Sequence, residues 1–249
     1  MRSTMNRGTS RGLEDTAKEV ALASSGDETW VIVPAFNEGT RILRVLDELT
    51  AVVANVVVVD DGSEDDTGFH VLTRPVWLVT HPANLGQGAA IQTGIDFALA
   101  RGAAYVVTFD ADGQHRPQDI PVLVSSLQRN EADFALGSRF LGSATGMPIS
   151  RHILLKLAVL VTRVLSGVKL TDAHNGLRAM TRGGAASLQI RHNRMEHASE
   201  IIDQIRHCGR KYIEVPVQIR YTADTLAKGQ RMSDAIGLGL RMLLRRVVR

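Results

Sequence analysis

The stretch that decides the fold of this chain is Val106-Val107-Thr108-Phe109-Asp110-Ala111-Asp112-Gly113-Gln114-His115. A short run of β-prone residues leads directly into two carboxylates, which predicts a buried strand that ends in polar side chains. Open α/β sheets carry their ligand-binding groups at the carboxyl ends of the strands. The stretch therefore predicts an α/β fold whose chemistry is centred on Asp110 and Asp112.

Asp110 and Asp112 form a predicted metal site. Side chains two residues apart on an extended backbone point the same way, and two carboxylates so close repel each other unless a cation lies between them. Mg²⁺ and Mn²⁺ prefer oxygen ligands and often bridge carboxylates to phosphates. Gln114 can add an amide oxygen. In the alternative interpretation, Asp112 only caps a helix that begins near Pro117.

Composition limits the class of protein. The 249 residues are 44% hydrophobic, enough for one substantial core, so we expect a single domain with tails. The net charge of +3 and the aromatic content of 4% are not typical of nucleic-acid binding, and we expect no nucleic-acid partner. The single Cys208 excludes an internal disulfide and suits a reducing cytoplasm.

We expect three regions and no transmembrane segment. Residues 1–26 are polar and rich in Ser, Thr and Gly, so they are predicted to be a disordered tail rather than a signal peptide. Residues 27–222 are predicted to form the folded domain, and residues 223–249 a basic amphipathic helix. No apolar run reaches the roughly 18 residues that span a bilayer.

The C-terminal helix is predicted over Ser233–Arg249. Its apolar residues fall on one face, with arginines opposite or beside them. They are Ile236, Leu240, Leu243, Leu244 and Val247, with Arg241, Arg245, Arg246 and Arg249. Such a helix suits an anionic membrane surface, where each Arg contributes about 1 kcal/mol. The alternative is that the apolar face packs on the domain or on a second subunit, which would make a homo-oligomer.

The first part of the chain predicts a βαβ unit that brings polar loops to one edge of the sheet. Trp30–Pro34 is a predicted strand ended by the proline, Arg41–Val53 a helix and Val56–Val59 the second strand. Asp60-Asp61-Gly62-Ser63 follows that strand. A carboxylate there can accept a hydrogen bond from a ribose hydroxyl or a base N–H, although Ser63 or Asp61 also suits a helix cap.

Val76–Val79 is a predicted third strand, and Asn84-Leu85-Gly86-Gln87-Gly88 is predicted to open the next helix. Free N–H groups and the positive end of the helix dipole make this start a candidate anion site. The alternative is that Gly86 and Gly88 permit tight helix–sheet packing. Neither the dinucleotide-binding Gly-x-Gly-x-x-Gly pattern nor a P-loop is present at the required place, which excludes ordinary dehydrogenases and P-loop enzymes.

Four motifs stand in order along the chain: Pro34-Ala35-Phe36-Asn37-Glu38, Asp60-Asp61-Gly62-Ser63, Asn84-Leu85-Gly86 and Asp110-Ala111-Asp112-Gly113-Gln114. Together they resemble the family 2 glycosyltransferases, in particular the dolichol- or polyprenyl-phosphate mannose and glucose synthase branch. The resemblance covers roughly Thr29 to Tyr221. It implies a GT-A fold, which is a Rossmann-like, mostly parallel sheet flanked by helices, a nucleoside diphosphate sugar donor and inversion at the anomeric carbon.

The second half of the chain extends the resemblance. Gly137-Ser138-Arg139 follows a strand predicted over Asp133–Leu136 and is similar to the family's Gly-Ser-Arg, whose arginine meets the acceptor phosphate. Thr171–Arg178 resembles the family's Asp followed by Gly-Phe-Arg, with leucine in place of phenylalanine. Glu196–Glu200 begins a helix where the family tends to hold an acidic residue near the acceptor.

Three further segments follow from the sequence. Arg151 opens a helix predicted over Ile153–Leu165, which is either core or lies at the membrane surface. Two late strands are predicted over Lys211–Val215 and Val217–Tyr221, and Arg220 matches a further phosphate-facing arginine of the family.

Two departures from the family pattern affect the acceptor assignment more than the donor assignment. Gln87 stands where many relatives have lysine, and Ala227–Arg231 resembles a tail of bacterial surface-polysaccharide transferases.

The hypothesis is a metal-dependent, inverting transfer of a hexose from a GDP-mannose or UDP-glucose type donor to a polyprenyl or dolichyl phosphate. The expected site is at the cytoplasmic inner face of the membrane, with the protein bound peripherally. The residues assigned to the donor are Pro34, Phe36, Glu38, Asp60, Asp61, Asn84, Asp110 and Ala111. The residues assigned to the metal, Mg²⁺ or Mn²⁺, are Asp110, Asp112 and Gln114. The acceptor phosphate is assigned to Arg139, Arg151 and Arg220. Catalysis is assigned to Asp112, Arg139 and Asp172.

Other functions remain open at this point. A sugar hydroxyl of a lipid-linked or cell-surface precursor as acceptor requires a carboxylate base, with Asp172, Glu196 or Glu200 as candidates. A sugar nucleotidyltransferase would carry a Gly-rich basic loop after the first strand, where this chain has the segment 35–38. An inactive nucleotide-sugar-binding protein is expected to have lost an acidic ligand, and both are present here.

Overall fold

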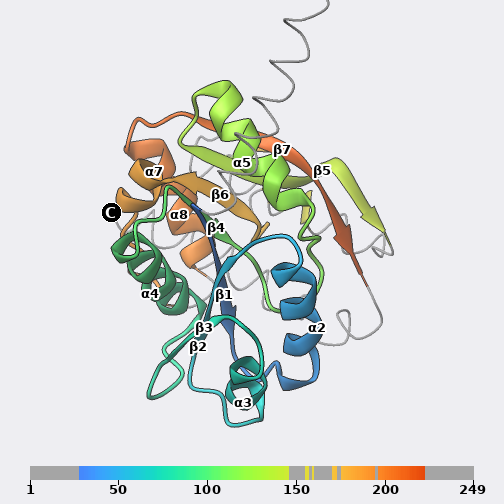
Figure 1. The fold of residues 1–249 in the computed structure, drawn as a ribbon. Helices are drawn as coiled ribbons and strands as arrows, with labels where there is room; N and C mark the ends of the chain where they lie inside the picture. The colour runs from blue at the N-terminus through green and yellow to red at the C-terminus, as the bar shows by residue number, and fades with distance from the viewer. Residues whose placement is uncertain are drawn as a thin grey trace, which may run out of the picture.

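Runs of β-branched and apolar residues form the centre of a seven-stranded sheet (Figure 1). The computed structural model describes residues 28–145, 155–156, 159, 170–172, 175–193 and 196–221. The strands are β1 Thr29–Ala35, β2 Asn55–Asp60, β3 Trp77–Thr80, β4 Tyr105–Thr108, β5 Phe134–Thr145, β6 Arg178–Thr181 and β7 Tyr212–Arg220. Across the sheet they follow the order β3-β2-β1-β4-β6-β5-β7.

Helices cover both faces of this sheet (Figure 1). They are α2 Gly39–Thr50, α3 Thr67–Leu72, α4 Gln87–Ala100, α5 Asp119–Asn130, α7 Arg182–Ala186 and α8 His197–His207. Alternate residues of β1 enter two separate cores, because side chains of a strand point to opposite faces in turn. Val31 and Val33 share one core with α2 and α5, whereas Trp30 and Ile32 share the other with α4 and α8.

The sheet is mostly parallel, as predicted. β1 pairs in parallel with β2 and β4, β2 with β3, and β5 with β7. Only β6 is antiparallel to its neighbours, β4 and β5. Strand β6 was not predicted, because only one residue of Arg-Ala-Met-Thr is β-branched. It therefore forms through pairing with strands that are distant in sequence.

Two prolines do not end strands where the sequence predicted it. β1 continues through Pro34 to Ala35, because Pro34 lies beyond Ile32, the last β1 residue paired with β4. Its missing N–H therefore breaks no bond on that side. β7 is one strand and not two, because it lies at the edge of the sheet, where Pro216 needs no ladder donor.

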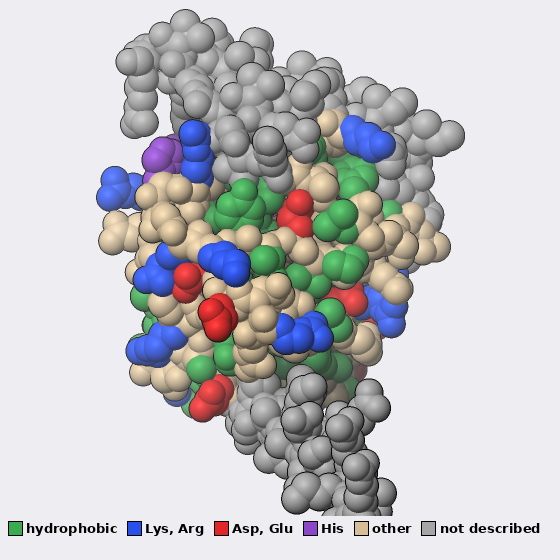
Figure 2. All heavy atoms as spheres, turned by 90° about the horizontal axis from the view of Figure 1, so that it is seen from above, with side chains coloured by type: hydrophobic (Ala, Val, Ile, Leu, Met, Phe, Trp, Pro, Cys, Tyr) green, Lys and Arg blue, Asp and Glu red, His purple; other side chains and the backbone are tan. Residues whose placement is uncertain are grey.

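The surface of the described residues is mixed in charge on the face shown in Figure 2, where Lys and Arg side chains alternate with Asp and Glu. No helix in the described part of the chain is long and apolar enough to cross a membrane. The predicted tail 1–26 and helix 223–249 lie outside the described residues, as does Arg151. Within the helix predicted over Ile153–Leu165, residues 155, 156 and 159 are described, and they are helical.

Candidate active site

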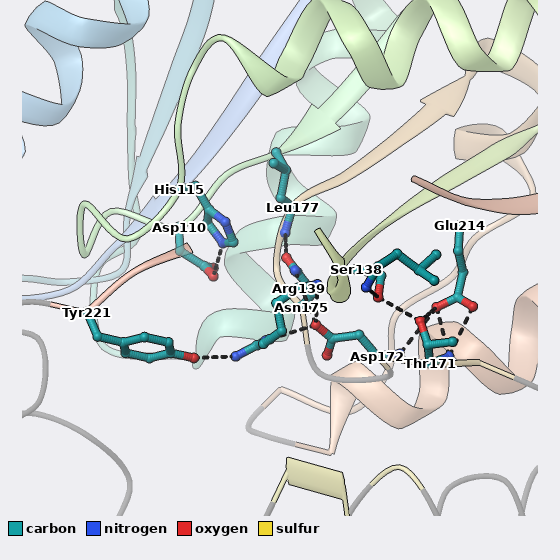
Figure 3. Close-up of polar contacts among 11 residues, drawn as sticks. Asp110, His115, Ser138, Arg139, Thr171, Asp172, Asn175, Leu177, Glu214 and Tyr221 are labelled. Carbon is teal, nitrogen blue, oxygen red and sulfur yellow. Dashed lines mark hydrogen bonds and ion pairs between the residues drawn. The ribbon is translucent and has the colours of Figure 1, made fainter. Parts of the chain in front are cut away.

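Asp110 and Asp112 lie in the loop after β4, at the carboxyl edge of the sheet. Oδ2 of Asp110 is 3.0 Å from Nε2 of His115, and Figure 3 shows the two side chains pointing toward each other. Oδ1 of Asp110 accepts a hydrogen bond of 3.1 Å from Nε2 of Gln87. Because His115 is itself buried, the protein fixes the Asp110 carboxylate from two sides.

The two carboxylates have opposite pKa shifts. Burial opposes the ionisation of Asp110, but the hydrogen bond and charge of His115 outweigh it and hold the pKa below its usual value. The charges of Arg178 and His197 act in the same direction. Burial, and next the negative charge of Asp110, raise the pKa of Asp112. Asp110 is therefore readily ionised, whereas Asp112 resists ionisation.

The donor atoms of this loop fit a divalent cation. Asp110, Asp112 and Gln114 carry the hard oxygen ligands that Mg²⁺ and Mn²⁺ prefer. After burial, the charge of Asp110 contributes to the raised pKa of Asp112, and a cation between the two carboxylates would relieve that repulsion. Among the described residues, no group of three or more His, Cys, Asp and Glu side chains is arranged as a metal site. A cation here therefore needs further oxygens, from Gln114 or from a bound phosphate.

The alternative interpretation of Asp112 as a helix cap is wrong. Oδ1 of Asp112 accepts a hydrogen bond of 3.0 Å from the backbone N–H of Gln114, inside its own loop. Helix α5 begins only at Asp119, and no side chain caps its first turn. The second oxygen of Asp112 is thus not committed to a helix.

The loop after β1 is fastened to the loop after β2. The backbone N–H of Asn37 donates to Oγ of Ser63 over 2.9 Å, and Oδ1 of Asn37 accepts from the N–H of Glu64 over 2.9 Å. The N–H of Glu38 donates to Oγ1 of Thr67 over 2.8 Å. Asn37 has a φ of 53°, a left-handed conformation that asparagine tolerates better than most residues. Phe36 remains 42% exposed, so its ring is accessible to a ligand at this edge.

Asp60 and Asp61 are buried and bind the protein's own backbone. Oδ1 of Asp60 accepts from the N–H of Ser63 over 3.0 Å. Asp61 accepts from the N–H groups of Leu85 and Gly86, at 3.0 and 2.7 Å. The helix-cap alternative for Asp61 and Ser63 is wrong, because α3 has no side-chain cap.

His81 completes the surroundings of Asp61. Its Nδ1 lies 2.7 Å from Oδ1 of Asp61, and its Nε2 lies 2.9 Å from Oγ1 of Thr93 on α4. Asp61 therefore sets the path of the loop that carries the exposed Asn84, and any contribution to donor binding acts through that loop.

The start of α4 is covered by protein. The N–H of Gly88 donates to the carbonyl oxygen of Asn193 over 2.9 Å. A Cβ on Gly86 would lie 2.1 Å from that same oxygen, and one on Gly88 would lie 2.1 Å from the carbonyl oxygen of His192. The two glycines do permit tight packing, but against the segment of His192 and Asn193 and not against the sheet as predicted, and the Gly88 N–H is taken by the protein.

A second polar cluster lies around Arg139 and Asp172 (Figure 3). Oδ2 of Asp172 accepts from Nε of Arg139 at 2.6 Å and from its backbone N–H at 3.1 Å. Nη1 of Arg139 donates to the hydroxyl of Tyr221 over 2.6 Å. Burial lowers the pKa of Arg139, but the charges of Asp172 and Tyr221 and their hydrogen bonds outweigh it, so the pKa is raised. Two nitrogens of this guanidinium are therefore engaged inside the protein.

Three arginines were predicted to bind the acceptor phosphate jointly, Arg139, Arg151 and Arg220, and the structure describes only the first and the last of them. Arg220 is placed beside the metal loop, because its backbone N–H donates to the carbonyl oxygen of Gln114 over 2.9 Å. Its side chain forms a half-exposed ion pair of 3.7 Å with Glu48 of α2. Arg151 lies outside the described residues. The common phosphate contact stays a prediction.

Two of the three candidate bases are engaged in internal contacts. Asp172 is ion-paired with Arg139, and its side chain is 1% exposed. The Glu200 carboxylate accepts from the backbone N–H groups of Arg191 and His192, at 2.8 to 3.1 Å. Glu196 precedes α8 and does not cap it.

Three polar residues of this site were given no role from the sequence, His115, Glu214 and Arg178, although Arg178 is the arginine of the motif Thr171–Arg178. His115 directly follows the metal motif, where it was given no role. Arg178 is buried; burial lowers its pKa, and the charges of Asp110 and Asp172 oppose that shift. Glu214 had a visible signal, because it is the one carboxylate within the apolar strand β7.

Gly176 is needed for Asp110 to keep its place. A Cβ on Gly176 would lie 2.0 Å from Oδ2 of Asp110, which His115 and Gln87 hold in position. We expect Gly176→Ala to lower turnover by about 10-fold or more, because the carboxylate must shift. Steady-state kinetics checks this, with Gly183→Ala as control, since its Cβ would meet only the flexible Arg210 side chain. Equal turnover in the two variants would contradict the assignment.

Known proteins resemble this chain along most of its length. The family model described as glycosyl transferase family 2 matches residues 30–188. An uncharacterized protein of Methanocaldococcus jannaschii is 33% identical over 226 residues, covering 89% of this chain and 93% of that protein. The UDP-N-acetylglucosamine–dolichyl-phosphate N-acetylglucosaminyltransferase of Methanococcus voltae is 29% identical, covering 86% and 94%. The polyprenol monophosphomannose synthase of Mycolicibacterium smegmatis is 32% identical, covering 68% and 67%.

Solved structures share the fold. Glucosyl-3-phosphoglycerate synthase from Mycobacterium tuberculosis, in complex with Mn²⁺, uridine diphosphate and phosphoglyceric acid, superposes with a TM-score of 0.71. It is 18% identical and covers 99% of this chain and 84% of its own. The implied GT-A architecture is thereby confirmed.

Proposed function

This chain belongs to glycosyl transferase family 2, and from that premise we propose that it transfers a hexosyl group from a nucleoside diphosphate sugar to a polyprenyl phosphate. The observation that carries the proposal is the Asp110–Asp112 pair at the carboxyl edge of β4, beside the fastened loops after β1 and β2. Relatives named for transfer to dolichyl, polyprenol and undecaprenyl phosphates support the acceptor class.

The donor half of the proposed site consists of the loops after β1, β2 and β4. Phe36 offers an exposed ring beside the nucleoside position, and Asp61 holds the loop of Asn84 at the same edge. Asp110, Asp112 and Gln114 would hold Mg²⁺ or Mn²⁺ against the diphosphate. When bound, such a cation supplies positive charge that stabilises the departing diphosphate. The donors of GDP-mannose and UDP-glucose type remain the expected choices.

The acceptor half favours a phosphate over a sugar hydroxyl. A phosphate oxygen is already ionised near neutral pH and needs no strong general base. Asp172 is buried against Arg139, and Glu200 is bound by backbone N–H groups, so neither carboxylate is free to take a proton from a hydroxyl. Inversion follows from direct attack by the acceptor phosphate on the face of the sugar opposite the leaving diphosphate.

The proposed place of work is the cytoplasmic face of a membrane. A polyprenyl phosphate is a membrane lipid, so the enzyme has to reach the bilayer surface. The basic helix predicted over 223–249 is the candidate contact, with packing on a second subunit as its alternative.

Product formation tests the proposed function. Purified protein is incubated with polyprenyl phosphate vesicles, Mn²⁺ or Mg²⁺ and a panel of radiolabelled GDP- and UDP-sugars, and the organic phase is counted. We expect a mild-acid-labile lipid product that disappears with Asp112→Ala. Asp203→Ala, an exposed acid on α8, is the matched control and should retain activity.

The outcomes of that assay separate the candidate functions. Sugar transfer to a hydroxyl acceptor, without any lipid phosphate product, would overturn the acceptor assignment. Donor binding without transfer to any acceptor would move the chain to the class of inactive nucleotide-sugar-binding proteins.

A further inference from the structure

Glu214 of β7 makes an unusual number of contacts with a single loop. Its Oε1 accepts from the backbone N–H of Thr171 at 2.8 Å, from the hydroxyl of Thr171 at 2.8 Å and from the N–H of Asp172 at 3.2 Å. Its Oε2 accepts from the Thr171 N–H at 3.0 Å. Figure 3 shows this carboxylate directed at residues 171 and 172. One side chain thus fixes two successive peptide groups of the loop.

This contact is stronger than an ordinary side-chain hydrogen bond. A carboxylate that accepts from backbone N–H groups forms charge-assisted bonds, which are about twice as strong as neutral ones. The Thr171 hydroxyl also lies 2.6 Å from Oγ of Ser138, the residue before Arg139 on β5. The loop is therefore held between β7 and β5, the two strands that carry the acceptor half.

The loop in turn sets the direction of Arg139. Oδ2 of Asp172 accepts both from the backbone N–H and from Nε of Arg139, while Oδ1 of Asp172 is buried with no hydrogen-bond partner in the described part of the chain. One oxygen of Asp172 thus binds both the backbone and the side chain of Arg139, so a shift of the Asp172 backbone would move the guanidinium. The Glu214 bonds to the Thr171 and Asp172 N–H groups fix the backbone from which Asp172 extends.

We propose that Glu214 is a positioning residue for the acceptor half of the reaction, acting through Thr171 and Asp172 on Arg139. This inference rests on the proposed function. The hydrogen bonds of the Glu214 carboxylate described above do not reach the donor loops after β1, β2 and β4, which are held by their own bonds to Ser63, Thr67 and His115. Loss of Glu214 should therefore affect the acceptor and spare the donor.

The test compares Glu214→Ala and Glu214→Gln with the wild-type chain. Glutamine keeps one acceptor oxygen and the side-chain length but loses the charge, so it should restore part of the function. The matched control is Asp133→Asn. That carboxylate also joins separate segments, through 2.9 Å bonds to Thr181 and Arg210, and these bonds do not involve Thr171 or Asp172.

Two measurements are made on each variant. Residue-resolved amide hydrogen exchange reports the Thr171 and Asp172 N–H groups, and steady-state kinetics reports KM for donor and acceptor separately. For Glu214→Ala we expect exchange at both amides to be about fivefold faster or more, the effect of losing one hydrogen bond. We expect KM for the acceptor to rise about 10-fold, with donor KM within about twofold, and Glu214→Gln to lie between.

The outcomes distinguish this inference from the proposed function. Unchanged exchange at Thr171 and Asp172 in Glu214→Ala would overturn the positioning role. Donor and acceptor KM values of Glu214→Ala that rise together would overturn it too, because a general loss of structure has that effect. Asp133→Asn shows what such a general loss looks like. If the wild-type chain makes no lipid-linked product, the proposed acceptor fails. The role of Glu214 is then still decided by two comparisons of the Glu214 variants with the wild-type chain. One is the amide exchange at Thr171 and Asp172, and the other is KM for the hydroxyl acceptor that is used instead.

Discussion

Asp112→Asn should lower turnover by about 100- to 1,000-fold and at the same time make the cation-free protein more stable at neutral pH. The loss of turnover follows from the role of a metal ligand, because removing one group that stabilises charge in a transition state commonly costs roughly 10²–10³-fold. The gain in stability follows from the pKa of Asp112, which burial and the charge of Asp110 raise. Function and stability therefore change in opposite directions.

The pH dependence of that gain has a definite sign. A group whose pKa is raised by folding adds stability at low pH, where it is protonated, and this contribution is lost as the pH rises through the folded-state pKa. Above that pH the wild-type protein holds two repelling carboxylates. The amide introduced by Asp112→Asn is neutral and keeps an oxygen that can accept from the Gln114 N–H, as the carboxylate does.

Thermal unfolding without divalent cation measures the effect between pH 4 and pH 8. We expect the variant to melt roughly 2–4 °C above the wild-type chain at pH 8, the shift that about 1 kcal/mol produces in a chain of this size, and the difference to shrink toward pH 4. Added Mn²⁺ should raise the melting temperature of the wild-type protein only. A lower melting temperature of the variant at pH 8 would disprove the repulsion.

Arg139→Ala should destabilise the fold by about 3–5 kcal/mol, the largest stability loss that we expect from an ion pair among the described residues. The substitution leaves Asp172 as a buried carboxylate without its cation, and the Asp172 side chain is 1% exposed. Tyr221 also loses the donor that lies 2.6 Å from its hydroxyl. Asp172→Asn combined with Arg139→Ala should recover part of the loss, because the unpaired charge is then removed.

Urea unfolding of the single and double variants measures this expectation. Arg210→Ala is the matched control, because Arg210 pairs with Asp133 at 2.9 Å but is 39% exposed, and such pairs contribute about 1 kcal/mol or less. If Arg139→Ala is no more destabilising than Arg210→Ala, the pair at Asp172 is not a buried one. A double variant less stable than Arg139→Ala would show that the buried charge is not the cause.

The centre of the fold was predictable because its signals are local. Buried strands such as β1 and β2 are continuous apolar runs, and each delivers its polar motif to the carboxyl edge of the sheet. Strand β6 was not predictable, since four residues of which only Thr181 is β-branched pair because β4 and β5 lie on either side. The prolines of β1 and β7 were misinterpreted for a related reason, because their effect depends on which side of the strand has a neighbour.

The candidate site likewise has a part that the sequence predicts and a part that it does not. The motif around Asp110 and Asp112 was recognisable, and the metal fit of that loop agrees with it, although the individual roles remain proposals. The contacts that fix the site were not recognisable, because they join residues far apart in sequence. Glu214 lies 43 positions from Thr171, and the carbonyl group of Asn193 that covers Gly88 belongs to a segment with no regular structure.

The antiparallel strand β6 also has a consequence for the order in which the molecule is made. β4 ends at Thr108 and β6 ends at Thr181, so about 70 residues are synthesised in between, which takes roughly 4–15 seconds at about 5–20 residues per second. Over that time one edge of β4 has no strand partner, and its N–H and C=O groups are open to wrong pairing. β5 emerges first and is not the strand that belongs there. In the nascent chain β4 and β5 must therefore not pair with each other, because β6 has to insert between them once it is synthesised.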